Sequence, residues 1–89
     1  MKTSINVKII GRVQGVWFRV STQKKALQLN IKGWVKNASD GSVEACFQSD
    51  QSTLKQMVRW CHKGPEMAQV EKVITTRSNE PEHHDFKIR

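Results

Sequence analysis

The spacing of apolar residues alternates along this chain between a period of two residues and a period of about 3.6 residues, and the order of these periods restricts the fold. The shorter period predicts a strand with one buried face, whereas the longer one predicts a helix with one buried side. Each helical segment lies between strand-like segments. The predicted order is therefore β-α-β-β-α-β, followed by a short terminal strand.

Turn and cap residues mark the ends of these segments. Asn30 predicts the end of the first helix, because Asn tolerates the left-handed conformation found there. Asp40-Gly41 lies between two alternating segments and predicts a hairpin, and Gly64-Pro65 predicts the end of the second helix. We expect strands at residues 3–10, 31–37, 41–48, 69–76 and 85–89, a helix from residue 16 or 17 to 29, and a second helix from a cap at Ser52 or Thr53 to about residue 63.

Two helices that cover one face of a mainly antiparallel sheet satisfy this order of segments. We therefore predict an α+β fold, namely a ferredoxin-like α/β sandwich. A chain of 89 residues has the length of one domain, so we assign residues 1–89 to a single domain. We also expect a monomer. No apolar run is long enough to cross a membrane and the first residues do not resemble a signal peptide, so we expect a cytoplasmic protein without a membrane partner.

The first loop has the pattern of an anion site. Gly11-Arg12-Val13-Gln14-Gly15 joins the first strand to the first helix, and glycines allow successive backbone N–H groups to point inward. The helix start adds unpaired N–H groups. Arg19 falls in the first turn of the helix, where its planar guanidinium could bind two phosphate oxygens. The pattern alone is equally compatible with a tight turn beside a surface arginine.

Asn37 is the second candidate. It closes the second strand, and a β-α-β crossover makes the first two strands parallel, so their C-terminal ends share one end of the sheet. Ligands often bind outside such strand ends. The alternative is an asparagine whose side chain bonds to its own loop backbone.

At these residues the chain resembles the acylphosphatase family. Residues 11–19 and 33–43 resemble the two long family signatures, and the chain has the family's length, order of segments and typical ending, Phe86-Lys87-Ile88-Arg89. One departure is Ser49, which stands where the second signature usually closes with glycine. It follows the catalytic residues at the end of the third strand, so we expect activity to be unaffected.

The resemblance implies a hydrolase that cleaves the carboxyl-phosphate bond of acyl phosphates without a metal, a cofactor or a phosphoenzyme. It implies that Asn37 orients the attacking water and that inorganic phosphate is both product and inhibitor. It also implies that Arg19 and backbone amides hold the phosphate, the amides being those of Gly11, Arg12, Val13, Gln14, Gly15 and Val16. The physiological acyl phosphate is not specified.

The basic residues are concentrated in the first half of the chain. Residues 1–39 contain eight of the 15 lysines and arginines and none of the 8 acidic residues, within a net charge of +7. Such a half attracts anions, which include phosphate esters, nucleic acids and acidic membrane surfaces. It holds no carboxylate that could bind Mg²⁺ or act as a general base. A basic surface that only aids solubility is the other interpretation.

A nucleic-acid-binding module is the main alternative from another class. RNA-binding domains share this topology, and Trp17, Trp34 and Trp60 could stack on bases. The predicted third strand lacks the interleaved aromatic and basic residues of an RNA-recognition motif, so we do not expect nucleic acid as a partner. Trp34 is either exposed near the site or packed under a helix. A third alternative is a regulatory domain that keeps the phosphate site within a larger assembly.

The cysteines and histidines do not form a familiar metal motif. Cys46 and Cys61 are 15 residues apart and form no CxxC pair, which argues against zinc. We therefore predict no metal site and two free, partly buried thiols. His83 and His84 lie in a polar loop and are assigned to the surface, and His62 is assigned to the cationic end of the second helix.

Overall fold

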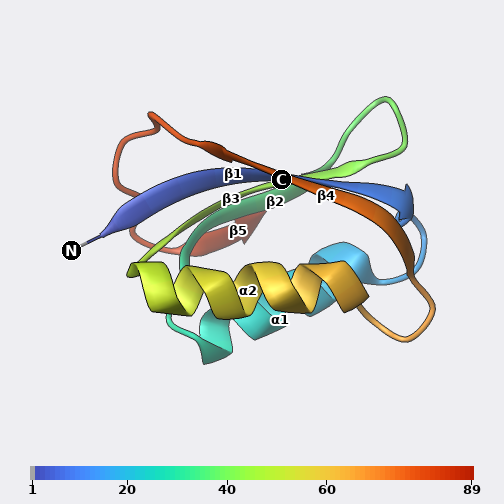
Figure 1. Ribbon diagram of the computed structural model, residues 1–89, viewed down its shortest axis with the longest axis horizontal. Helices are drawn as coiled ribbons and strands as arrows, with labels where there is room; N and C mark the ends of the chain where they lie inside the picture. The colour runs from blue at the N-terminus through green and yellow to red at the C-terminus, as the bar shows by residue number, and fades with distance from the viewer. Residues whose placement is uncertain (1) are drawn as a thin grey trace.

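The computed structural model describes residues 2–89, which form two helices and one five-stranded sheet (Figure 1). This arrangement confirms the predicted α+β fold and its order of elements. Along the chain the elements are β1 (Thr3–Arg12), α1 (Phe18–Gln28), β2 (Lys32–Asn37), β3 (Val43–Ser49), α2 (Gln51–Lys63), β4 (Gln69–Arg77) and β5 (Phe86–Ile88).

The strands lie in the order β4-β1-β3-β2-β5. β1 pairs antiparallel with both β3 and β4, β2 pairs antiparallel with β3, and β5 joins β2 in parallel. Because β1 and β2 are each antiparallel to β3, they run parallel to one another. Their C-terminal ends therefore lie at the same end of the sheet, as predicted, and this end receives both the first loop and Asn37.

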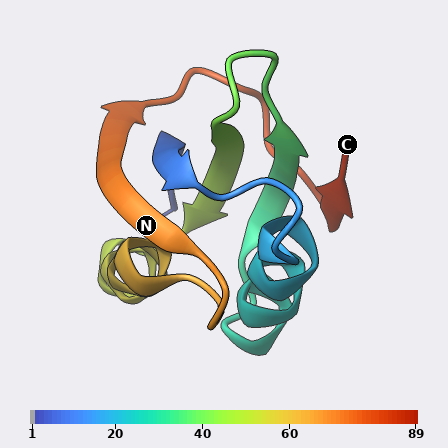
Figure 2. The ribbon, with the colours of Figure 1, turned by 90° about the vertical axis from the view of Figure 1, so that its right-hand side faces the viewer.

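Both helices cover the same face of the sheet (Figures 1 and 2). α1 packs mainly against β2 and β5, and α2 packs mainly against β4. The apolar core fills the space between these layers and includes Val7, Ile9, Phe18, Val35, Val43, Phe47, Leu54, Met57 and Phe86. The opposite face, called here the open face, carries no helix within residues 2–89. The crossover segment, residues 78–85, joins β4 to β5 and contacts this face.

The first loop is shorter than predicted, because β1 continues through Gly11 and Arg12. These residues pair with Val70 and Gln69 of β4 after a shift of register at Ile10. Gly11 has a φ of 138°, and a Cβ atom there would meet the Gln69 carbonyl oxygen at 2.2 Å. The absence of a side chain at Gly11 therefore permits the close approach of β4. The loop that remains between β1 and α1 comprises residues 13–17.

The helix ends follow local capping chemistry. Asn30 has a φ of 61° just beyond α1, which confirms the predicted stop. The predicted cap of α2 is wrong by two or three residues: Asp50 caps this helix, and its Oδ1 accepts a 2.8 Å hydrogen bond from the Thr53 N–H. Asp is among the best N-cap residues, so Ser52 and Thr53 fall inside the first turn. Within residues 2–89, no helix is both long enough and apolar enough to cross a membrane.

Candidate active site

The loop between β1 and α1 presents unpaired backbone amides. Gly15 and Trp17 have φ values of 73° and 67°, so the chain curls just before the helix. The first helical bond runs from the Ser21 N–H to the Trp17 carbonyl at 3.0 Å. Within residues 2–89, the backbone N–H groups from Gln14 to Val20 donate to no protein acceptor. Free amides at a helix N-terminus favour a bound anion.

Arg19 and Asn37 line one pocket beside this loop. The pocket has a volume of about 230 Å³, and its other lining residues are Val13, Gly15, Trp17, Phe18 and Val20. Arg19 lies in the first turn of α1, and Asn37 is the last residue of β2, as predicted. The fold therefore brings together the two side chains that the sequence singled out.

Neither polar side chain in this pocket has a protein partner within residues 2–89. The Arg19 guanidinium therefore keeps its five N–H donors for a ligand. Asn37 does not bond to its own loop backbone, which was the alternative interpretation of this residue. Trp17 is 73% exposed and lines the same pocket.

Gln14 connects the loop to the β2–β3 hairpin. Its side-chain Nε2 donates to the carbonyl oxygens of Ala38 and Ser42, both at 2.8 Å. Ala38 directly follows Asn37, so one side chain links the amide loop to the strand end that carries Asn37. Sequence reasoning assigned Gln14 only a backbone role and missed this bridge, because no local pattern relates residues 24 positions apart.

Asp40 shapes the hairpin and forms an ion pair with β1. Its Oδ1 accepts hydrogen bonds from the Ser42 N–H at 3.0 Å and the Ser42 hydroxyl at 2.6 Å, and its Oδ2 lies 2.7 Å from the Lys8 Nζ. The hydrogen bond from Lys8 and those from Ser42 hold the pKa of Asp40 well below its usual range. The carboxylate therefore remains ionised, bonded to Ser42 within the hairpin and paired with Lys8 of β1.

The three tryptophans occupy different parts of the molecule. Trp17 lines the pocket of Arg19 and Asn37, while Trp60 packs against Phe18 with ring centroids 5.6 Å apart. Trp34 is neither exposed near the site nor packed under a helix. It is 8% exposed on the open face, where its indole N–H donates to Glu80 Oε1 at 2.8 Å. The three rings therefore do not form one stacking surface.

The histidine assignments are confirmed at two positions and wrong at one. His62 is exposed in the last turn of α2 and His84 is exposed in the crossover segment. The His83 side chain is only 19% exposed, and its Nε2 lies 2.9 Å from Glu80 Oε1. Its backbone N–H donates to Gln48 Oε1 at 2.7 Å, so contacts with the sheet draw His83 away from solvent.

Both cysteines are free, as predicted, and both are fully buried. Cys61 belongs to the core between α2 and the sheet, and burial raises the pKa of its thiol to about 12. Cys46 lies in β3 on the open face, where burial also raises the pKa of its thiol, although hydroxyl groups of Ser4 and Ser78 oppose that effect. Neither thiol lies in the pocket of Arg19 and Asn37.

Together these features define a ferredoxin-like domain with an amide loop, a free guanidinium and a free carboxamide at one end of its sheet. The acylphosphatase family model matches residues 5–88. An acylphosphatase of Nitrosococcus oceani is 43% identical over 89 residues, which cover 100% of both chains. The chain belongs to the acylphosphatase family, whose members are hydrolases acting on acid anhydrides.

Solved structures agree with this assignment. An acylphosphatase from Coxiella burnetii is similar with a TM-score of 0.94 and 38% identity, and the match covers 99% of this chain and 93% of that one. An acylphosphatase from Bacillus subtilis gives a TM-score of 0.92 and 34% identity, with coverage of 100% and 99%. The fold and the family therefore lead to the same class of enzyme.

Ser49, the departure from the second signature, fits its position without strain. It ends β3 opposite Thr3. Within residues 2–89, the non-glycine residues with a positive φ are Trp17 and Asn30, so the backbone at residue 49 does not require glycine. This position also lies outside the pocket of Arg19 and Asn37.

Proposed function

We propose that this chain hydrolyses the carboxyl-phosphate bond of small acyl phosphates in the pocket shared by Arg19 and Asn37. One observation carries the proposal. The guanidinium of Arg19 and the carboxamide of Asn37, both without a protein partner within residues 2–89, line one pocket beside the unpaired amides of the loop. Membership of the acylphosphatase family supports the same activity.

In this proposal the phosphoryl oxygens lie against the loop amides and the Arg19 guanidinium. The amides named in this proposal run from Gly11 to Val16. Those of Gly11 and Arg12 lie in the part of β1 that pairs with β4, whereas those from Gln14 onward have no protein acceptor within residues 2–89. Phosphoryl transfer depends mainly on positioning and on neutralising the charge of the phosphoryl oxygens. A planar guanidinium can bind two of those oxygens at once. Preorganised amides and one arginine therefore supply both requirements.

Asn37 places the attacking water. A carboxamide both donates and accepts hydrogen bonds, so it can hold a water molecule without adding negative charge beside the phosphate. The water oxygen attacks phosphorus, the bond from phosphorus to the carboxyl oxygen breaks, and the carboxylate leaves with the bonding electrons. The water proton passes to the phosphate product or to solvent. Because a carboxylate is a stable leaving group, the step needs no general acid, metal or cofactor.

The test is hydrolysis of a small aromatic acyl phosphate in the presence of EDTA. We expect turnover that inorganic phosphate inhibits competitively, because the product occupies the same amide and guanidinium donors. All the groups in the proposal come from one chain, so turnover per chain should not depend on protein concentration. Turnover that requires an added divalent ion, or salt-sensitive retention of RNA without any turnover, would contradict the proposal.

A further inference from the structure

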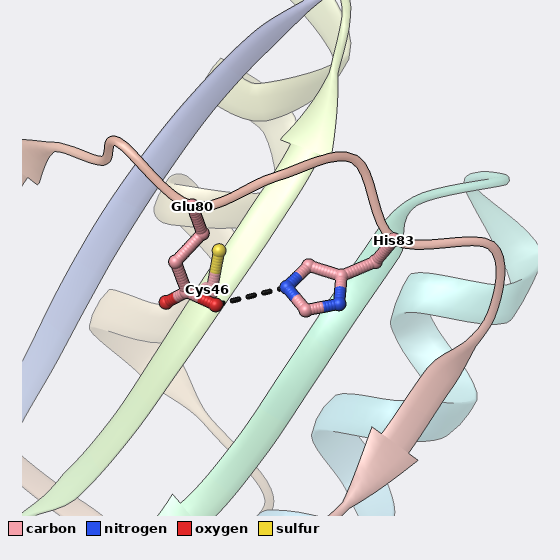
Figure 3. Close-up of side chains that lie close together, drawn as sticks. All are labelled: Cys46, Glu80 and His83. Carbon is pink, nitrogen blue, oxygen red and sulfur yellow. Dashed lines mark hydrogen bonds and ion pairs between the residues drawn. The ribbon is translucent and has the colours of Figure 1, made fainter.

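A sulfur, a carboxylate and an imidazole meet on the open face of the sheet (Figure 3). They belong to Cys46 in β3 and to Glu80 and His83 in the crossover segment. The Cys46 Sγ, a Glu80 carboxylate oxygen and a His83 ring nitrogen all lie within 4.8 Å of one another. None of these residues lines the pocket of Arg19 and Asn37.

Surrounding contacts hold Glu80 and His83 in place. His83 Nε2 lies 2.9 Å from Glu80 Oε1, and the same oxygen accepts a 2.8 Å hydrogen bond from the Trp34 indole N–H. The backbone of His83 is held by the Gln48 side chain at 2.7 Å. Partners that fix the orientation of ligand side chains are a regular feature of metal sites. This arrangement already directs a nitrogen and an oxygen toward the space beside the buried thiol.

The chemistry of the three donors favours a transition-metal ion of the zinc type over Mg²⁺ or Ca²⁺. Thiolate, imidazole and carboxylate are the ligands of zinc, whereas Mg²⁺ and Ca²⁺ require oxygen ligands. Zinc bonds of about 2.0–2.3 Å in tetrahedral geometry place ligand atoms about 3.3–3.8 Å apart. Separations of up to 4.8 Å therefore need to shorten by up to about 1.5 Å, and the 2.9 Å separation of His83 Nε2 and Glu80 Oε1 needs to widen by about 0.4 Å. Rotation of the Glu80 and His83 side chains can supply both changes.

We propose that Cys46, Glu80 and His83 bind one Zn²⁺ ion, with water as the fourth ligand. The thiol releases its proton to solvent as the sulfur–zinc bond forms. The ion takes the place of the hydrogen bond between His83 and Glu80 and links the crossover segment to β3. Asn6 lies directly opposite Cys46 in the β1–β3 pairing, and its buried Oδ1 has no hydrogen-bond partner within residues 2–89. The metal-bound water would supply a donor on that side.

This site is separate from the proposed hydrolysis, so its expected role is to stabilise the fold. An ion that binds only the folded chain shifts the unfolding equilibrium toward that chain. We expect Zn²⁺ to raise the urea midpoint of unfolding and to leave the rate of acyl phosphate hydrolysis unchanged.

The experiment uses untagged, reduced protein that has been freed of metal with a chelator and transferred to phosphate-free buffer. Calorimetric titration with Zn²⁺ should show one ion per chain, and Co²⁺ should produce a thiolate-to-metal charge-transfer band. In Cys46→Ser and His83→Gln we expect at least tenfold weaker binding and a smaller rise in the urea midpoint at the same Zn²⁺ concentration. Cys46→Ser, which lacks the thiolate, should also lack the charge-transfer band. The matched controls Cys61→Ser and His84→Gln should bind like the unmodified protein.

Two results would overturn the inference: no saturable Zn²⁺ binding by the unmodified protein, or equal binding by Cys46→Ser and His83→Gln. Circular dichroism without metal checks that each variant folds. If the buried Cys46→Ser change prevents folding, Glu80→Gln takes its place, because Glu80 is only partly buried in the crossover segment. Hydrolysis measured in EDTA on the same samples separates a failure of the zinc proposal from a failure of the proposed function.

Discussion

Gln14 and Ala38 are joined by a 2.8 Å hydrogen bond from the Gln14 side-chain Nε2 to the Ala38 carbonyl oxygen. The same nitrogen donates to the Ser42 carbonyl at 2.8 Å. It therefore contacts the residue that follows β2 and the residue that precedes β3. Because Ala38 follows Asn37, this side chain sets how the amide loop faces the proposed water-positioning residue. The geometry of the pocket should therefore depend on a residue whose side chain need not touch the substrate.

We predict that Gln14→Ala lowers kcat about tenfold or more, because misplacement by about 1 Å can cost roughly 10²-fold in rate. The stability loss should be modest, at about 1 kcal/mol for each side-chain hydrogen bond removed. Gln23→Ala is the matched control, since its Nε2 also donates to a backbone carbonyl, that of Phe86, at 3.0 Å. Steady-state kinetics and urea unfolding of both variants measure the two effects. Equal kcat values for the two variants would refute the positioning role of Gln14.

Arg19→Ala should abolish phosphate inhibition and reduce kcat/KM by about 10²–10³, the usual effect of losing a preorganised donor to a transition state. Arg12→Ala removes the same charge from the exposed end of β1 and keeps the backbone amide, so it should retain most of the activity. The comparison separates a specific guanidinium from the general basic charge of the first half. Comparable losses in the two variants, measured at several salt concentrations, would indicate that charge alone matters.

Asn37→Ala should leave phosphate inhibition largely intact but stop turnover, because the variant loses only the group that holds the water. Asn37→Asp is expected to weaken phosphate binding as well, since it adds a negative charge beside the anion. The inhibition constant for phosphate and the value of kcat distinguish these outcomes. A near-normal kcat in Asn37→Ala would show that another group positions the nucleophile.

The glycines Gly11 and Gly15 should respond differently to alanine. Gly15→Ala places a side chain in open space at a φ of 73°, so it should cost about 1–2 kcal/mol from backbone strain alone. Gly11→Ala directs a Cβ atom at the Gln69 carbonyl oxygen, so β1 and β4 must separate and the loss should be larger. Urea unfolding tests this order, and a Gly11→Ala variant as stable as Gly15→Ala would contradict it.

Asp40 should contribute to stability in a pH-dependent way. Its pKa in the folded chain is lowered by Lys8 and Ser42, so the folded state favours the ionised form. That stability is fully present above the unfolded pKa of about 4 and is lost as the pH falls toward the folded pKa. The stability difference between the unmodified chain and Asp40→Asn should therefore shrink between neutral pH and about pH 2. A difference that stays constant across that range would rule out the linkage.

Local patterns predicted the elements and placed most of their ends within one or two residues of the observed ones. The alternation around Ile5, Val7 and Ile9 marks β1, and the Asp40-Gly41 turn and Asn30 end elements as expected. Periodicity, turn residues and cap residues each act on backbone that lies within a few residues along the chain. They misplaced the α2 cap, the end of β1 and the start of β3 by two or three residues. Asp50 caps α2 in place of the nearby serine and threonine, Gly11 extends β1 because it pairs with β4, and Gly41 belongs to the turn that precedes β3.

The candidate pocket was predictable only in part. The order of strand-like and helix-like segments predicts that β1 and β2 are parallel. The loop after β1 and the residue that ends β2 are therefore expected at the same end of the sheet, where ligands often bind. The family signatures assigned roles to Arg19 and Asn37 at those positions. The bridge from Gln14 to the hairpin has no sequence signal, because its acceptors are backbone carbonyls that any residue could supply.

The sequence by itself determined the order of strands and helices along the chain, the turn between β2 and β3 and the excess of basic charge in the first half of the chain. Tertiary structure alone decided that His83 leaves solvent, that Trp34 lies on the open face and that Cys46 meets Glu80 and His83. The reason is physical. Periodicity and capping act between near neighbours in the chain, whereas these contacts depend on the path of the crossover segment against a sheet assembled from distant strands.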